Sequence, residues 1–148
     1  MAATLHDVLL APDIQPKIIA DSYTLVEEEV HDMSGISGAA VKVAYKTVST
    51  FMPGHVRFMV ESLMPRMIEE LDPYWADFNA AGGSDFGDYL TKRSDEVSES
   101  LLAVTDERAA ASDRPTIIRA YRSVRGGAAK HVKAALPRMG ALVVKYAS

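Results

Sequence analysis

The chain has 148 residues, of which 48% are hydrophobic and 24% are charged, and its formal net charge at pH 7 is −4. This composition is typical of one globular domain and argues against a disordered chain. The absence of cysteine excludes disulfides, thiolate catalysis and zinc or iron–sulfur sites with sulfur ligands. The sequence shows neither a signal-peptide pattern nor an apolar stretch of membrane-spanning length, so we expect a cytoplasmic domain.

Positive charge is concentrated at the end of the sequence. Residues 114–148 carry eight Lys or Arg and no acid, while residues 1–113 carry the other eight basic residues and all twenty acids, a balance of 8 − 20 = −12. Separated like charges repel each other. We therefore expect the basic C-terminal segment 114–148 to pack on the acidic body 1–113, or to bind an acidic partner.

Helical periodicity dominates the sequence, beginning with two helices in its first third. The first has Asp13 as its predicted N-cap and ends at Ser34-Gly35, a small and flexible pair. The second runs from Ile36 to about Met52 and places Lys42 and Lys46 on one face. Its other face is apolar and consists of Ile36, Ala40, Val43, Thr47 and Phe51.

The middle of the chain predicts further helices separated by proline. The clearest amphipathic helix runs from His55 to Leu71, with a predicted kink or break at Pro65. Asp72-Pro73 predicts a restart. Another helix is expected from Ser84 to about Ala111. The aromatic cluster that follows the restart, Tyr74, Trp75 and Phe78, is typical of core packing. Three methionines, Met59, Met64 and Met67, lie on the apolar stripe of the His55–Leu71 helix.

The basic segment predicts two more helices. Asp113 and Pro115 resemble a cap followed by a first-turn proline, Gly126-Gly127 predicts a turn, and Pro137 predicts one more boundary. The sum is an all-α fold: a compact single domain over residues 1–148, built as a bundle of about six or seven helices, several of which start at Asp-Pro or Pro breaks.

Several short segments resemble a known family. They are Ser37-Gly38-Ala39-Ala40-Val41-Lys42, Tyr45-Lys46, Pro53-Gly54, Leu71-Asp72-Pro73, Leu102-Ala103-Val104-Thr105-Asp106 and Lys130-His131-Val132-Lys133-Ala134-Ala135-Leu136-Pro137-Arg138. Together, from about Leu5 to Leu142, they are similar to a family of small helical actinobacterial proteins, a domain of unknown function. The resemblance implies an all-α fold and carries over no catalytic or binding residue.

Motifs for catalysis or metal binding are weak. Glu28 and His31 have the Glu-x-x-His spacing of di-iron bundles, but such sites need a second copy and two more glutamates. A solvated acidic face is the favoured interpretation. Gly35-Ile36-Ser37-Gly38 lacks the last glycine of a nucleophile elbow, and Ser37 is interpreted as an N-cap. We therefore predict no catalytic residue, metal or cofactor, and a binding module rather than an enzyme.

The basic segment supplies the candidate binding residues, which recur at three-residue steps along two predicted helices. The leading hypothesis is helix-mediated association, including homodimerisation or binding of another protein, through an apolar face flanked by this basic stripe. The alternatives are binding of nucleic acid or an anionic membrane, and carriage of a small apolar ligand in a methionine-lined groove. The stripe consists of Arg119, Arg122, Arg125, Lys130 and Lys133.

Overall fold

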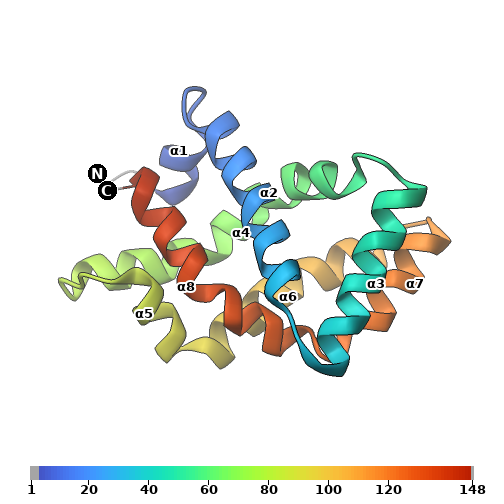
Figure 1. Cartoon of the computed structure of the whole chain (residues 1–148). Coiled ribbons are helices and arrows are strands. Elements are labelled where there is room, and N and C mark those ends of the chain that lie inside the picture. The colour runs from blue at the N-terminus through green and yellow to red at the C-terminus, as the bar shows by residue number, and fades with distance from the viewer. Residues whose placement is uncertain (1–3, 148) are drawn as a thin grey trace.

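The computed structural model describes residues 4–147 and contains eight helices within them (Figure 1). No strand occurs in this described part of the chain, and the helices form a single compact domain, so the all-α prediction is confirmed. The helices are α1 (Leu5–Leu9), α2 (Gln15–Asp32), α3 (Gly35–Phe51), α4 (His55–Ala80), α5 (Phe86–Lys92), α6 (Ser94–Ala110), α7 (Pro115–Arg125) and α8 (Ala128–Ala147).

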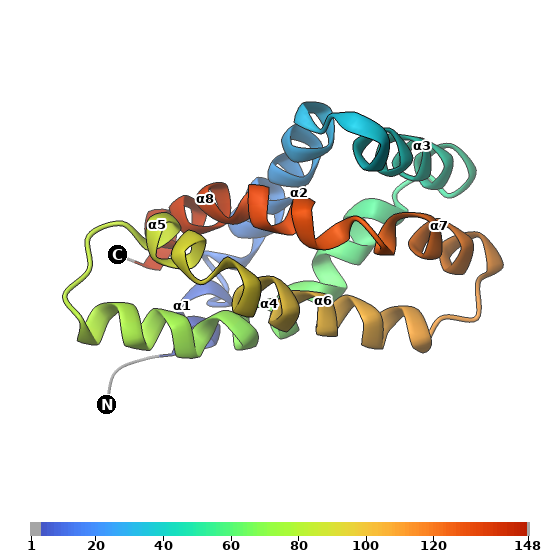
Figure 2. The same ribbon diagram turned by 90° about the horizontal axis from the view of Figure 1, so that it is seen from below.

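The hydrophobic core lies between α4 and α8, the two longest helices, with α1, α2, α5 and α6 packed around them (Figure 2). Within the predicted aromatic cluster, Phe78 is buried and Trp75 is half-buried. Both rings contact Phe86, at centroid distances of 5.1 and 5.0 Å. The fully buried aliphatic core residues are Leu5, Leu9, Leu90, Val97 and Leu136.

Two glycines allow α5 to cross α8 at backbone contact. A Cβ atom on Gly140 of α8 would lie 2.3 Å from the backbone nitrogen and 2.4 Å from the Cα of Gly87 in α5. Real Cβ atoms do not approach other atoms so closely, so Gly140 requires the smallest residue, and a Cβ atom on Gly87 would lie a tight 3.0 Å from the carbonyl oxygen of Pro137. This crossing anchors the C-terminal helix on the core.

The helix start predicted at Pro115 is confirmed, whereas no helix begins or ends at three other prolines where a boundary was predicted. Pro65 and Pro73 lie inside α4, and Pro137 lies inside α8. An internal proline removes one helical hydrogen bond and costs about 3 kcal/mol. Buried neighbours offset that cost: Met64 beside Pro65 and Leu136 beside Pro137 both belong to the core.

Three predictions of an aspartate N-cap were also wrong. Asp72 does not begin a new helix; its carboxylate accepts a hydrogen bond of 2.8 Å from the backbone N–H of Leu5. It therefore supports the N-terminus of α1, where Thr4 and Asp7 also form a capping box. Helix α1 was not predicted from the sequence. The observed N-caps of α2 and α7 are Ile14 and Arg114, each one residue after the aspartate that was expected to cap the helix, Asp13 or Asp113.

The long helix predicted from Ser84 is two helices. α5 begins at Phe86, after Asp85, whose side chain accepts a hydrogen bond from the backbone N–H of Asp88. The chain then bends at Arg93, whose guanidinium lies over the Tyr89 ring at 3.9 Å. The bend lets α5 pack on α8 while α6 packs on both α8 and α4.

α3 and α7 lie side by side at one end of the molecule in both views (Figures 1 and 2). α7 has no buried residue, and the only buried residue of α3 is Gly38. The pair is thus the part of the domain with the least contribution to the core. No helix within residues 4–147 has the length and apolarity needed to cross a membrane.

Candidate functional site

The five predicted basic residues do not converge on one site. Arg119 and Arg122 are exposed on α7, Lys130 is exposed near the start of α8, and none of them forms an ion pair within residues 4–147. Arg125 and Lys133 instead bind acids of α6. The stripe therefore divides into residues that hold the fold together and residues that face solvent.

Arg125 belongs to a polar network between α6 and α7. Its guanidinium donates to both carboxylate oxygens of Asp106, at 2.7 and 3.1 Å. The Tyr121 hydroxyl donates to the same carboxylate and lies 2.8 Å from the Thr105 hydroxyl. The bonds from Arg125 and then Tyr121 lower the pKa of Asp106. The paired, bidentate geometry fixes α7 on α6.

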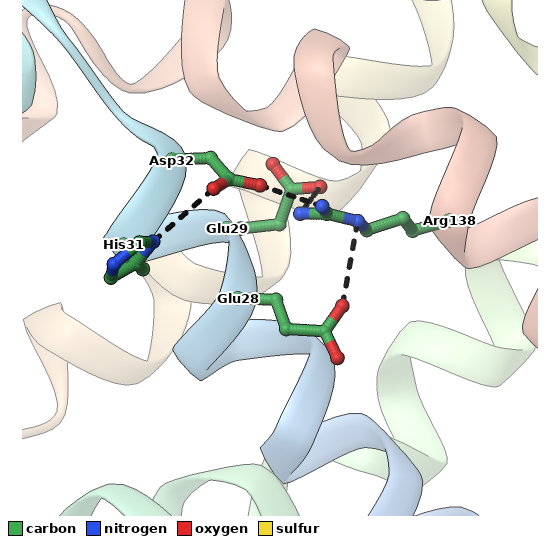
Figure 3. A network of polar contacts seen from close by, with 5 residues as sticks. All are labelled: Glu28, Glu29, His31, Asp32 and Arg138. Carbon is green, nitrogen blue, oxygen red and sulfur yellow. Dashed lines mark hydrogen bonds and ion pairs between the residues drawn. The ribbon is translucent and has the colours of Figure 1, made fainter.

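Lys133 and two further cations of α8 bind acids of the body. Lys133 pairs with Asp95 of α6, and Lys145 lies 2.9 Å from Asp21 of α2. Arg138 lies among three acids of α2 (Figure 3). Its nitrogens lie 3.6, 2.9 and 2.6 Å from carboxylate oxygens of Glu28, Glu29 and Asp32.

The acidic face expected on this part of α2 is exposed at Glu28 and Asp32 and half-buried at Glu29, and all three acids also pair with Arg138. Glu28 turns toward Arg138 rather than toward His31, whose ring contacts Asp32 at 3.3 Å (Figure 3). The hydrogen bond from Arg138 and then the one from His31 lower the pKa of Asp32. This arrangement binds α8 to α2, and the three acids act as structural partners of Arg138.

The N-terminus of α3 is anchored by a residue that sequence reasoning misinterpreted. Ser37 was expected to be an N-cap, but the N-cap is Ser34, and the Ser37 hydroxyl lies 3.0 Å from Nε2 of the buried His131 in α8. Tyr45 packs toward α2, and burial followed by the neighbouring Tyr23 raises its pKa to about 12. These contacts set which face of α3 points inward.

The outward face of α3 is apolar. Ile36 is 93% exposed, Val43 66% and Phe51 75%. All three belong to the apolar face identified from periodicity, while Val41 and Tyr45 on the inward side are half-buried. α3 therefore has two apolar faces, of which one is packed and the other is open.

An apolar pocket of about 340 Å³ lies between α2 and the first half of α4. Its seventeen lining residues include sixteen apolar ones, and Ser22 is the one polar side chain among them. Its inner wall is core, including Ile18 and Ile68, whereas its outer wall is half-buried. Four methionines line it, three of them those singled out in the sequence: Met59, Met64, Met67 and Met139.

A second pocket, of about 390 Å³, lies on the other side of α4, against α6 and the start of α7. It shares Met59 with the apolar pocket but is more polar, with Arg108 and Arg114 in its lining. His55 also lines it, and the buried Nε2 atom of that ring has no hydrogen-bond partner among the described residues. Burial, followed by the charges of Arg114 and Arg108, lowers the pKa of His55.

Comparison with known proteins identifies the chain by family. The match covers residues 5–147 and is to a family described as a family of unknown function (DUF6918). The chain belongs to the DUF6918 family. The match extends over nearly the same residues as the resemblance noted in the sequence. No curated protein and no solved structure matches the chain. The description of the DUF6918 family assigns neither a fold nor a site residue.

Sequence reasoning found three of the four methionines of the apolar pocket and the apolar stripe of α4 that forms one wall, but not the opposite wall. Ser22, Leu25 and Val26 of α2 form the wall of the pocket opposite α4, and this wall was not predicted. Periodicity shows that residues share one face of a helix, but it does not give the distance between that face and a neighbouring helix. His55 carried no motif at all. The pairing of Arg125 and Lys133 with α6 was detectable only as overall charge complementarity.

Proposed function

We propose that the protein is a non-enzymatic carrier of a small apolar molecule, held in the apolar pocket between α2 and α4. The observation that carries this proposal is a pocket of about 340 Å³ with sixteen apolar lining residues out of seventeen. Ligand pockets are typically concave and apolar, with few polar groups that fix orientation. Here Ser22 is the group that can serve that purpose.

The chemistry of the lining favours an apolar occupant. The pocket opens to solvent along its half-buried outer wall, so without a ligand it holds water against sixteen apolar residues and one hydroxyl. A bound water needs two to four polar partners, which these side chains do not supply. Removing apolar surface from water returns about 25 cal/mol per Å², so an apolar ligand that displaces this water is favoured.

The pocket's size and chemistry define the ligand class. At about 30 Å³ per non-hydrogen atom, the pocket takes a chain of roughly ten carbon atoms or a fused pair of aromatic rings. Methionine side chains are flexible and polarizable, so the four in the wall can adapt to either shape. A neutral molecule with at most one hydroxyl suits the single polar contact at Ser22.

A fluorescence titration tests this proposal. 1-Aminonaphthalene, a neutral fused-ring probe whose emission changes in apolar surroundings and whose size matches the pocket, should bind the purified full chain saturably at one site and be displaced by 1-decanol. Ser22→Phe fills the pocket and should lower probe affinity at least tenfold. Ser49→Phe, at an exposed α3 position outside the pocket, is the matched control. Circular dichroism checks that both variants remain helical.

Two results would overturn the carrier proposal. One is the absence of saturable probe binding to the wild-type protein. The other is equal binding to the Ser22→Phe and wild-type proteins, which would place the probe elsewhere. Because Phe at position 22 enters space that is already empty, we expect this variant to be as stable as the wild type or more stable by about 0.5 to 2 kcal/mol.

Homodimerisation through an apolar face flanked by basic residues stays a prediction, as do the cytoplasmic location and a nucleic-acid role. The open face of α3 supplies the apolar part of such an interface. In a twofold dimer, however, the same patch meets itself, so Lys42 and Lys46 of each copy would approach like charges. This repulsion is why we place the carrier proposal first.

A further inference from the structure

The helix pair α3/α7 carries positive charge without any acid. Residues 35–51 contain Lys42 and Lys46, and residues 115–125 contain Arg119, Arg122 and Arg125, which together give +5. Since the whole chain carries −4, the rest of the molecule carries −4 − 5 = −9. The molecule is therefore strongly polarised, with its positive end at the α3/α7 pair (Figure 2).

Four of these five cations are available at the surface. Arg125 is bound to Asp106, but Lys42, Lys46, Arg119 and Arg122 are exposed and form no ion pair within residues 4–147. Asp32, just before α3, and Asp106 of α6 are each held by an arginine. Within residues 4–147 no acid forms an ion pair with the four exposed cations of α3 and α7.

A row of large apolar side chains lies between these cations. Ile36, Val43 and Phe51 are spaced seven and eight residues apart, which places them along one line of α3. They are 93%, 66% and 75% exposed, so most of the surface of the row faces solvent. Lys42 and Lys46 flank one side of the row. On the other side, Val43 and Phe51 line a shallow space between α3 and α7 together with Arg119.

We propose that the outer face of α3, with the flanking cations of α3 and α7, docks on an anionic lipid bilayer. An apolar row edged by lysine and arginine is the pattern of helices that lie in a membrane interface. The three apolar side chains enter the boundary between headgroups and acyl chains, while the long cationic side chains reach the lipid phosphates.

Charge and shape favour this occupant over three others. A second copy bound by the same face would bring eight exposed cations together, four from each protomer. Nucleic acid would contact the cations but leave Ile36 and Phe51 in water. An acidic partner helix seated in the shallow space between α3 and α7 would cover Val43 and Phe51 but not Ile36, the most exposed of the three, which does not line that space.

Vesicle co-sedimentation tests the docking face. The full chain should bind vesicles of phosphatidylcholine with 30% phosphatidylglycerol, bind pure phosphatidylcholine far more weakly, and be released as salt rises. The paired substitution Lys42→Glu with Lys46→Glu should lower the partition coefficient at least 25-fold, about fivefold per lysine removed. Phe51→Ser should lower it about tenfold through lost apolar insertion. Both sites are exposed, so neither variant should lose helical structure.

Lys17→Glu is the matched control, because this lysine is exposed at the end of α2 farther from α3 and should leave binding within about fivefold of the wild type. Docking and carriage are independent, so Ser22→Phe should bind vesicles like the wild type. Equal binding to charged and neutral vesicles, no binding at low salt, or an equal loss in the Lys17→Glu control would each overturn the docking proposal. So would retention of duplex DNA without retention of vesicles.

Discussion

The crossing of α5 over α8 gives a sharp prediction at Gly140. In Gly140→Ala the new Cβ would lie 2.3 Å from the Gly87 nitrogen, whereas ordinary contacts begin near 3.4 Å. The two helices must separate by about 1 Å, and such overpacking costs typically 1 to 3 kcal/mol. Alanine returns about 1 kcal/mol through its higher helix propensity. Because the clash is with backbone that cannot rotate away, the overpacking cost falls at the upper end of this range, and we expect a net loss of about 2 kcal/mol.

Gly126→Ala is the matched control, because its backbone already has helical angles and a Cβ there meets nothing within 4 Å. It should be neutral or stabilising by up to about 1 kcal/mol. For a chain of this length each kcal/mol shifts Tm by roughly 2 to 4 °C, so the two variants should differ by several degrees in thermal unfolding followed by circular dichroism. If Gly140→Ala melted at or above the wild type, the backbone contact between α5 and α8 would be wrong.

Three further predictions concern the polar network, the pocket and the α3 anchor. Asp106→Asn should cost about 0.5 to 1 kcal/mol near pH 7, a value reduced by the partial exposure of the pair with Arg125. Since the folded-state pKa of Asp106 is lowered, its contribution is present above about pH 4 and is lost as pH falls through the lowered pKa, so the Tm difference from wild type should shrink below pH 4. Met67→Ala should cost about 2 kcal/mol in urea unfolding and shift ligand preference from decanol toward longer alcohols; unchanged selectivity would place Met67 outside the site. Ser37→Ala should cost about 1 kcal/mol and speed amide exchange in α3 selectively, whereas uniform exchange would deny that the contact with His131 anchors this helix.

The helices themselves were largely predictable, because 3.6-residue periodicity is a local property of the sequence. α3 begins and ends within a residue of its expected bounds, and the turn at Gly126-Gly127 joins α7 to α8 as expected. The errors occur where tertiary packing overrides local signals. Pro65 remains inside α4 because its neighbours are held in the core, and the capping chemistry of Asp72 serves α1, which is 67 residues away in sequence.

The candidate sites were less predictable than the fold. Periodicity identified the apolar row of α3, but which of its two apolar faces packs inward depends on Ser37 and Tyr45 meeting partners on other helices. The basic stripe was visible as residue spacing, yet the spacing of Arg122 and Arg125 does not show that only Arg125 meets an acid. The apolar pocket required the distance between α2 and α4, which no local pattern encodes.

Methyl NMR of the methionines tests the carrier proposal most directly. The pocket is lined by four methionines, Met59, Met64, Met67 and Met139, while Met33 and Met52 lie outside it and serve as internal controls. On titration of the full chain with 1-decanol, the ε-methyl signals of the four pocket methionines should shift saturably and with one common dissociation constant, and those of Met33 and Met52 should stay in place. Unmoved pocket signals, or equal shifts at the two control methionines, would contradict an apolar binding site between α2 and α4.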